Sequence, residues 1–200
     1  MSCEDARYWD GQAAAFDDEP DHGLRDPGTY AAWERLLADT LPAPPSDIAD
    51  LGSGTGTLAL LMARLGHRVV GIDLSPAMVE RARVKARADG TDVTFEVGDI
   101  SDPPLADSSL DAVVVRHVLW ALPQPGTALD RWLTELRPGG RLVLVEGHWD
   151  TRTGLRAETV LELLRERAAD VQLRRLTESV YWGKDISDER YLVTAVRPSP

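Results

Sequence analysis

From about Ser46 onward, short runs rich in β-branched residues alternate with helix-length segments whose apolar residues recur every three or four positions. This alternation is typical of a parallel sheet with helices on both faces. The last two runs are separated by a polar segment too short for a crossover helix, so we expect them to form an antiparallel hairpin. The predicted strands are residues 46–51, 67–73, 92–99, 109–117, 140–148, 170–177 and 190–198.

The predicted fold class is therefore α/β: a doubly wound, mostly parallel seven-stranded sheet with a C-terminal antiparallel hairpin strand and an N-terminal helical cap. We expect a single domain over residues 1–200. Within it, residues 46–150 form the core, and residues 151–200 contribute a helix and the hairpin. Residues 1–45 are rich in aromatic and turn-forming residues, which favours a cap over the carboxyl edge of the sheet rather than a solvated arm.

The stretch DLGSGTG, residues 50–56, connects the first predicted strand to a predicted helix. Ligands of parallel sheets bind beyond the carboxyl ends of the strands, where this loop leaves the sheet. Its glycines permit backbone conformations closed to other residues and let a ligand approach the main chain. We also expect free amides at the helix start, which favour a carboxylate or phosphate. A glycine turn can serve only as a connection, so the loop alone does not decide the function.

Acidic residues stand at the carboxyl ends of three successive predicted strands. Asp73 ends the second strand, about 20 residues after Gly52, where an acid accepts hydrogen bonds from both ribose hydroxyls. Asp99 ends the third strand and can accept from an adenine amine while Ile100 packs on the ring. Each acid alone fits a helix cap or a solvated turn. Together with Asp50, at the end of the first strand, they indicate a nucleoside site.

Taken in order, these segments closely resemble the class I S-adenosylmethionine-dependent methyltransferases over roughly residues 46–150. The resemblance rests on DLGSGTG, GIDLSPAMVERAR, VGDI, LDAVVVRHVLWALPQP and LRPGGRLVLVEG. The opening YWDGQAAAFDDEPDHG also resembles the N-terminal cap of members that methylate small molecules. The resemblance implies S-adenosylmethionine as cofactor, S-adenosylhomocysteine as product, and an O, N or S atom of a small metabolite as acceptor.

The resemblance also implies roles for individual residues. Tyr8 matches the cap tyrosine that closes over the methionine portion, and Arg116 is expected near the sulfonium. Ser53 stands where the family often has Cys, a change of small effect if the backbone makes the contact. The residues that the resemblance assigns to cofactor binding are Tyr8, Asp50, Gly52, Ser53, Gly54, Asp73, Leu74, Met78, Asp99, Ile100 and Arg116.

Three of the four histidines are candidate general bases for an acceptor that must lose a proton. His117 and His148 follow the fourth and fifth predicted strands, and His22 lies in the predicted cap, so all three are expected at one mouth. His67 is expected at the opposite edge. A histidine at a strand end is also commonly a hydrogen-bonded spacer. The spacing of these residues matches no metal motif, so no metal site is predicted.

The composition restricts the partners. The formal net charge of −11 disfavours nucleic acid, because phosphate binding needs clustered Lys and Arg. The sequence has no apolar run of membrane-spanning length, and its single cysteine, Cys3, is consistent with a reducing compartment. We therefore expect a cytoplasmic protein with a small-molecule substrate. The oligomeric state is not predicted.

Two other functions are compatible with the same architecture. A nicotinamide-dependent oxidoreductase has the pattern G-x-G-x-x-G, whereas here the third glycine, Gly56, comes one position early. A protein that binds S-adenosylmethionine only to regulate or scaffold is the other alternative. The intact cofactor acids argue against this alternative without deciding the question.

Overall fold

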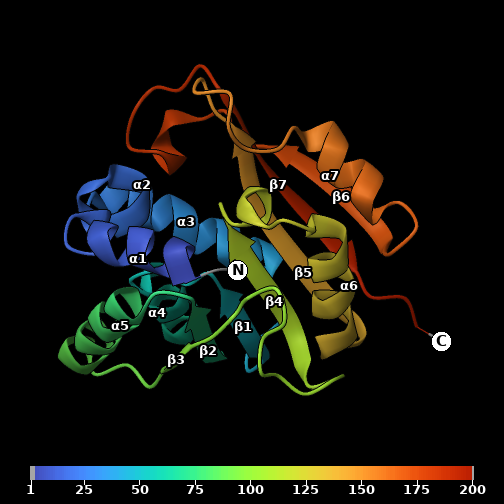
Figure 1. Ribbon diagram of the computed structural model, residues 1–200, viewed down its shortest axis with the longest axis horizontal. Helices are drawn as coiled ribbons and strands as arrows, with labels where there is room; N and C mark the ends of the chain where they lie inside the picture. The colour runs from blue at the N-terminus through green and yellow to red at the C-terminus, as the bar shows by residue number, and fades with distance from the viewer. Residues whose placement is uncertain (1–2, 200) are drawn as a thin grey trace.

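The computed structural model describes residues 3–199, with side chains from residue 5, so the outermost residues of the predicted single domain, 1–2 and 200, lie outside it. At its centre is a seven-stranded sheet in the order β3-β2-β1-β4-β5-β7-β6 (Figure 1). The strands are β1 (Asp47–Leu51), β2 (Arg68–Asp73), β3 (Thr94–Val97), β4 (Leu110–Arg116), β5 (Leu136–His148), β6 (Ala169–Arg175) and β7 (Glu189–Val196).

The pairing of the strands confirms the predicted fold class. Strands β3, β2, β1, β4 and β5 are mutually parallel, and β7 lies antiparallel between β5 and β6. The chain adds strands on one side of β1 and then, from β4 onward, on the other side. The connections that follow β1 and β4 therefore lie on opposite faces of the sheet, and a crevice opens at the carboxyl ends of these two strands. This is the edge at which the sequence places its glycine loop.

Helices cover both faces of the sheet (Figure 1). One buried cluster joins alternate strand residues such as Ile48 and Val114 to α3, α4 and α5, and the other joins their neighbours Ala49 and Val115 to α6 and α7. The helices are α1 (Cys3–Gln12), α2 (Pro20–Gly23), α3 (Pro27–Thr40), α4 (Thr57–Arg64), α5 (Pro76–Asp89), α6 (Pro125–Glu135) and α7 (Ala157–Leu164), with 3-10 turns η1 (Phe16–Asp18), η2 (Leu119–Ala121) and η3 (Ser179–Tyr181).

Helix α5 begins and ends where its sequence predicts. The side chain of Ser75 accepts a hydrogen bond from the Met78 amide at 3.1 Å, and Pro76 follows as the first helical residue. Gly90 ends the helix with a φ of 67°, in the left-handed region that favours glycine.

The segment RPGG, whose composition is typical of a turn between a helix and a strand, lies within β5. Helix α6 ends at Glu135, and β5 begins directly at Leu136, which pairs with Leu110. The register then shifts, so that Arg141 pairs with Ala112 and residues 137–140 form an irregularity in the strand. The Pro-Gly-Gly sequence therefore lies at an irregularity within β5 and does not form a separate turn before it.

The N-terminal segment packs on the C-terminal hairpin through aromatic side chains. Trp33 of α3 is fully buried, donates a hydrogen bond to the Tyr181 carbonyl at 2.7 Å and lies edge-on to the Trp182 ring. Trp182 donates in turn to the Leu176 carbonyl. Tyr181 and Trp182, which the sequence offers as walls of a substrate pocket, thus serve mainly as core residues here.

We predict that Gly56→Ala lowers the free energy of unfolding by roughly 2–4 kcal/mol, because it adds overpacking to a left-handed backbone. Gly56 has a φ of 81°, and an added Cβ would lie 2.6 Å from Cζ of Phe95. Gly90→Ala is the matched control, since its φ is 67° and nothing lies within 4 Å of the added Cβ. In urea unfolding, Gly90→Ala should lower the free energy of unfolding less than Gly56→Ala does. Equal decreases would show that packing against Phe95 is not the cause.

Candidate functional site

A cavity of about 500 Å³ lies at the carboxyl ends of β1, β2 and β4. Its floor is formed by the glycine loop and the ends of these strands. The N-terminal segment between Trp9 and His22 forms one wall, and residues from the end of β5 and the hairpin form the other. A volume of this size suits a small-molecule ligand.

The glycine loop makes space for the cavity, but its amides are not free. The amides of Gly52 and Ser53 donate to the Ile72 carbonyl at 2.8 and 3.1 Å, and the Gly54 amide donates to the Asp73 carboxylate at 2.8 Å. These three amides are therefore already paired, and any free amides for a carboxylate or phosphate lie further along, at the start of α4. At Gly52, with a φ of 74°, an added Cβ would lie 2.3 Å from Cγ2 of Val118. The Ser53 hydroxyl is buried without a hydrogen-bond partner among the described residues.

Asp73 joins the glycine loop to helix α5. Its two carboxylate oxygens accept from the amides of Gly54 and Ser75, each at 2.8 Å, and the residue lines the cavity. Burial raises the pKa of Asp73, while these two amides act in the opposite direction. The carboxylate is thus held at the position where an acceptor for ribose hydroxyls is predicted.

Most of the predicted site residues meet at this cavity. The ones that line it are His22, Gly52, Ser53, Gly54, Asp73, Leu74, Met78, Ile100, Arg116 and His117. Of the predicted aromatic wall, Trp120 and Trp149 also line it. The contiguous lining shows that the sequence motifs, far apart along the chain, belong to one site.

Four predicted site residues are not part of the lining. Tyr8 is 62% exposed on α1, and the neighbouring Trp9 lines the cavity instead, because consecutive helix residues point in different directions. Asp99 accepts hydrogen bonds from the amide and hydroxyl of Ser101. His148 lies at the end of β5, and Trp149 takes its place in the wall because successive side chains of an extended segment alternate in direction.

Asp50, the fourth, is buried beneath the glycine loop. Its side chain is nearly inaccessible, and one carboxylate oxygen has no hydrogen-bond partner among the described residues. Burial raises the pKa of Asp50 to about 7, while the Arg116 guanidinium acts in the opposite direction. Asp50 is thus a supporting residue for the loop and for Arg116.

Arg116 and His117 are placed by the end of β4. Arg116 donates to the Asp21 carbonyl at 2.5 Å and lies over the Trp33 ring. His117 has a φ of 57°, an uncommon left-handed conformation for a residue with a side chain, and its ring stacks on Trp182 at 5.8 Å between centroids. Burial, and then the charge of Arg116, lower the pKa of His117 well below its ordinary value.

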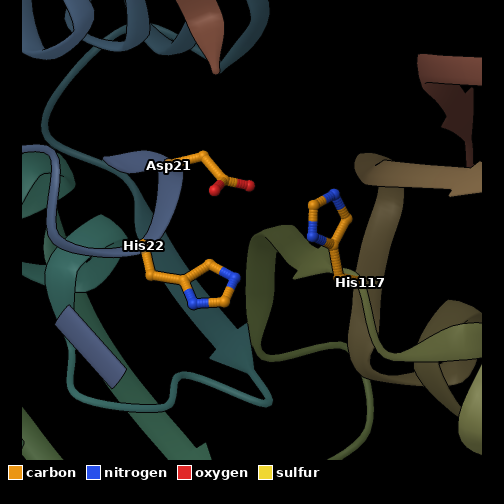
Figure 2. Close-up of side chains that lie close together, drawn as sticks. All are labelled: Asp21, His22 and His117. Atoms are coloured by element: carbon orange, nitrogen blue, oxygen red, sulfur yellow. The ribbon is translucent and has the colours of Figure 1, made fainter. Parts of the chain in front are cut away.

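The structure brings His22 and Asp21 opposite His117 (Figure 2). One ligand atom from each of the three side chains lies within 4.8 Å of the others. The His22 ring stacks on Phe16 at 4.3 Å between centroids, and its Nδ1 lies 3.2 Å from the Phe16 carbonyl. Burial lowers the pKa of His22, and Arg116 adds to this effect.

Glu146 fixes the loop that carries His117. Its Oε1 accepts from the amides of Val118 and Leu119 at 2.9 and 2.7 Å, from within the neighbouring strand β5. Burial raises the pKa of Glu146 to about 8, while the two amides act in the opposite direction. A buried carboxylate in this place explains how the left-handed His117 backbone is held.

Several lining residues were missed by sequence reasoning. Trp9 and Asp21 are direct neighbours of the predicted residues Tyr8 and His22 in the sequence. A helical pattern in the cap could therefore have indicated that Trp9 and Asp21 face the cavity. Others come from the same N-terminal segment, from the loop after β4, or from the second wall, where Arg190 near the start of β7 has no distinguishing motif. The missed residues are Trp9, Phe16, Glu19, Asp21, Val118, Ala121, Asp150, Thr151, Thr153, Lys184, Asp188 and Arg190.

Comparison with known proteins agrees with the geometry. Residues 49–144 match the model of a family described as a methyltransferase domain. Residues 49–144 are thus a domain of the class I S-adenosylmethionine-dependent methyltransferase type, as the sequence motifs of this segment indicate. The cofactor of this family is S-adenosylmethionine.

Curated relatives of this protein include enzymes named for small molecules. It is 38% identical over 122 residues to the demethylmenaquinone methyltransferase of Thermus thermophilus, covering 60% of this chain and 56% of that protein. It is 32% identical to the ubiquinone biosynthesis O-methyltransferase of Xanthomonas axonopodis, covering 69% and 55%. The chain spans 30% to 59% of the length of the curated relatives it matches.

Solved structures share the fold of this protein. A phosphoethanolamine N-methyltransferase of Haemonchus contortus, solved with S-adenosylmethionine, superposes with a TM-score of 0.77 at 18% identity, covering 96% of this chain and 58% of that one. Within the described residues, no helix has the length and apolar character needed to cross a membrane. The cytoplasmic location stays a prediction.

We predict that Glu146→Gln flattens the pH dependence of stability. Because burial raises the pKa of Glu146 to about 8 in the folded protein, while its ordinary value of 4.5 applies to the unfolded chain, the free energy of unfolding falls as pH rises between these values. Glutamine keeps the carbonyl acceptor and does not titrate. Urea unfolding between pH 5 and 8 should give the variant a shallower fall, and identical slopes would refute the assignment.

Proposed function

We propose that this protein transfers a methyl group from S-adenosylmethionine to an O, N or S atom of a small-molecule acceptor. The observation that carries the proposal is the single cavity in which the glycine loop and Asp73 share a continuous lining with His22 and His117. The relatives named for demethylmenaquinone and ubiquinone support a small acceptor. The net charge of −11 is unfavourable for nucleic acid.

One half of the cavity suits the cofactor. Asp73 would accept hydrogen bonds from the ribose hydroxyls, and the buried side chains of Met78 and Ile100 would pack against adenine. Gly52, which cannot carry a Cβ without striking Val118, lets the methionine portion lie against the main chain. The Ser53 hydroxyl, unpartnered in the described structure, is available to the same portion.

The other half suits an acceptor with an apolar or aromatic body. Trp120 and Trp149 lie edge to face at 5.6 Å between ring centroids, and both line the cavity. Trp120 is oriented by its own hydrogen bond to the His117 carbonyl at 2.9 Å. A flat ring would be held by these indoles with its heteroatom near His22 and His117.

Methyl transfer from a sulfonium is a direct displacement, so the protein mainly aligns nucleophile, methyl and sulfur in a dry site. Alignment of this kind can supply about 7–11 kcal/mol of the barrier. The aromatic wall would displace water from a bound acceptor, and Arg116, which contacts the Asp21 carbonyl and the Trp33 ring, positions the end of β4. The histidines face the site where a hydroxyl, ammonium or thiol acceptor would lose its proton.

Two competing functions make different predictions about ligands. A nicotinamide-dependent oxidoreductase would bind NAD, although the early position of Gly56 breaks its glycine pattern. A regulatory protein would bind S-adenosylmethionine and transfer nothing. Binding and turnover therefore have to be measured separately.

We predict that Asp73→Asn weakens S-adenosylhomocysteine binding at least about tenfold, since hydrogen bonds to a charged group contribute roughly 1.5–3 kcal/mol. Calorimetry on the same proteins should detect no NAD binding. Asp47→Asn is the matched control, because Asp47 lies at the opposite end of β1 and pairs with Arg68 and Arg137. Unchanged affinity in Asp73→Asn would show that the ribose is not bound there.

We predict that His117→Ala lowers turnover about 10²-fold or more while sparing cofactor affinity. Incubation of the protein and S-adenosylmethionine with a metabolite extract should yield S-adenosylhomocysteine, measured by mass spectrometry. His148→Ala, whose ring is not part of the cavity lining, should keep the wild-type rate. Full activity of His117→Ala would remove that residue from the mechanism, and bound cofactor without turnover would favour the regulatory function.

A further inference from the structure

Two imidazoles and one carboxylate converge in the acceptor half of the cavity (Figure 2). Asp21 and His22 come from α2, and His117 comes from the end of β4, 95 positions after His22 in the chain. Their ligand atoms lie within 4.8 Å of one another. We propose that Asp21, His22 and His117 bind a divalent transition-metal ion.

The donor set determines the class of ion. Imidazole nitrogen suits Zn²⁺, Fe²⁺ and related ions, whereas Mg²⁺ and Ca²⁺ prefer all-oxygen sites. Two histidines with one carboxylate leave a coordination position open, as in catalytic zinc sites with three protein ligands. Because all three residues line the cavity or lie against it, the open position faces the space in which an acceptor would bind.

The His22 ring is already arranged as a metal ligand. Its Nδ1 is within hydrogen-bond distance of the Phe16 carbonyl, which can only accept, so Nδ1 carries the proton and Nε2 keeps its lone pair. Figure 2 shows the other ring nitrogen turned toward the space between Asp21 and His117. The Phe16 ring, stacked on the imidazole, holds this orientation.

The Asp21 carboxylate is buried and only loosely paired. The residue is 5% exposed, and the Arg190 guanidinium approaches it no closer than 3.7 Å. Arg190 instead makes two hydrogen bonds to Asp188, at 2.8 and 3.0 Å. Arg116 donates to the Asp21 main-chain carbonyl and not to its carboxylate. The negative charge of Asp21 therefore remains available to a cation.

His117 is held in an uncommon geometry that turns its ring toward this pair. Its backbone lies in the left-handed region, with the next two amides bound by Glu146. The ring is oriented by stacking on Trp182 and by edge contact with Trp149, and its Nε2 is buried without a hydrogen-bond partner among the described residues. A backbone strained in this way and supported from a neighbouring strand is typical of a functional site.

The chemical role of the bound metal ion rests on the proposed methyltransferase function. An acceptor hydroxyl or thiol bound at the open position would have its pKa lowered by the ion and would release its proton to solvent. The resulting oxygen or sulfur anion forms the new bond to the methyl carbon. The carbon–sulfur bond of the sulfonium breaks, and neutral S-adenosylhomocysteine leaves with the electron pair.

The test is direct binding of Co²⁺ and Zn²⁺ to the full chain after treatment with a chelator. We expect saturable 1:1 binding, with the visible absorption of nitrogen-coordinated Co²⁺, and at least tenfold weaker binding for Asp21→Asn and His117→Ala. His67→Ala is the control, because His67 lies at the opposite edge of the sheet, and it should bind Co²⁺ as the wild type does.

Calorimetry with S-adenosylhomocysteine on the same samples separates the two proposals. Variants that bind this product as the wild type does are folded, so their loss of Co²⁺ binding supports the metal site. Absence of saturable Co²⁺ binding, or equal binding by Asp21→Asn and His117→Ala, overturns the metal site and leaves the methyltransferase proposal intact. Metal binding by a protein that fails to bind S-adenosylhomocysteine overturns the proposed function alone.

Discussion

The buried carboxylate of Asp73 is the interaction on which the site depends. Standing at the end of β2, it accepts the amides of Gly54 and Ser75 and so ties the connection after β1 to the start of α5. Glu146 does the same for the other half of the sheet, joining β5 to the loop after β4. Buried carboxylates tolerate this position because backbone amides compensate part of the desolvation cost. The crevice of the sheet is thereby held at a defined width.

The N-terminal segment completes the cavity through contacts with the same strand ends. Asp10 accepts hydrogen bonds from the Ser75 hydroxyl and the Ala77 amide, and Asp17 pairs with Lys85 at 3.0 Å and accepts from Thr55. Acidic residues that look solvated in the sequence are therefore what attaches this segment over the glycine loop. Since these contacts help to place Trp9, Phe16 and His22 at the cavity, the segment belongs to the site as much as the sheet does.

Much of the fold and half of the site follow from local patterns. The two buried clusters use alternate residues of each strand, so the β-branched runs predict both the strands and the faces that they cover. Parallel strand ends meet at one edge, which is why spacing indicated Gly52 and Asp73, whereas Arg116 came from the family resemblance. Tyr8 and His148 were misplaced by one position each, because side-chain direction depends on the exact start of an element, which sequence patterns locate poorly.

The sequence by itself determined the α/β architecture, the cofactor family and the residues at the ends of β1, β2 and β4, because these depend on periodicity and on short motifs. Only the tertiary structure decided that Asp21 and His22 stand opposite His117, and that Arg190 makes its hydrogen bonds to Asp188 while it lies 3.7 Å from the Asp21 carboxylate. Long-range packing of Trp33 on the hairpin and the amide bonds of Glu146 set those positions. Neither the Trp33 packing nor the Glu146 hydrogen bonds can be predicted from sequence periodicity, because contacts between distant segments depend on how whole helices and strands pack together.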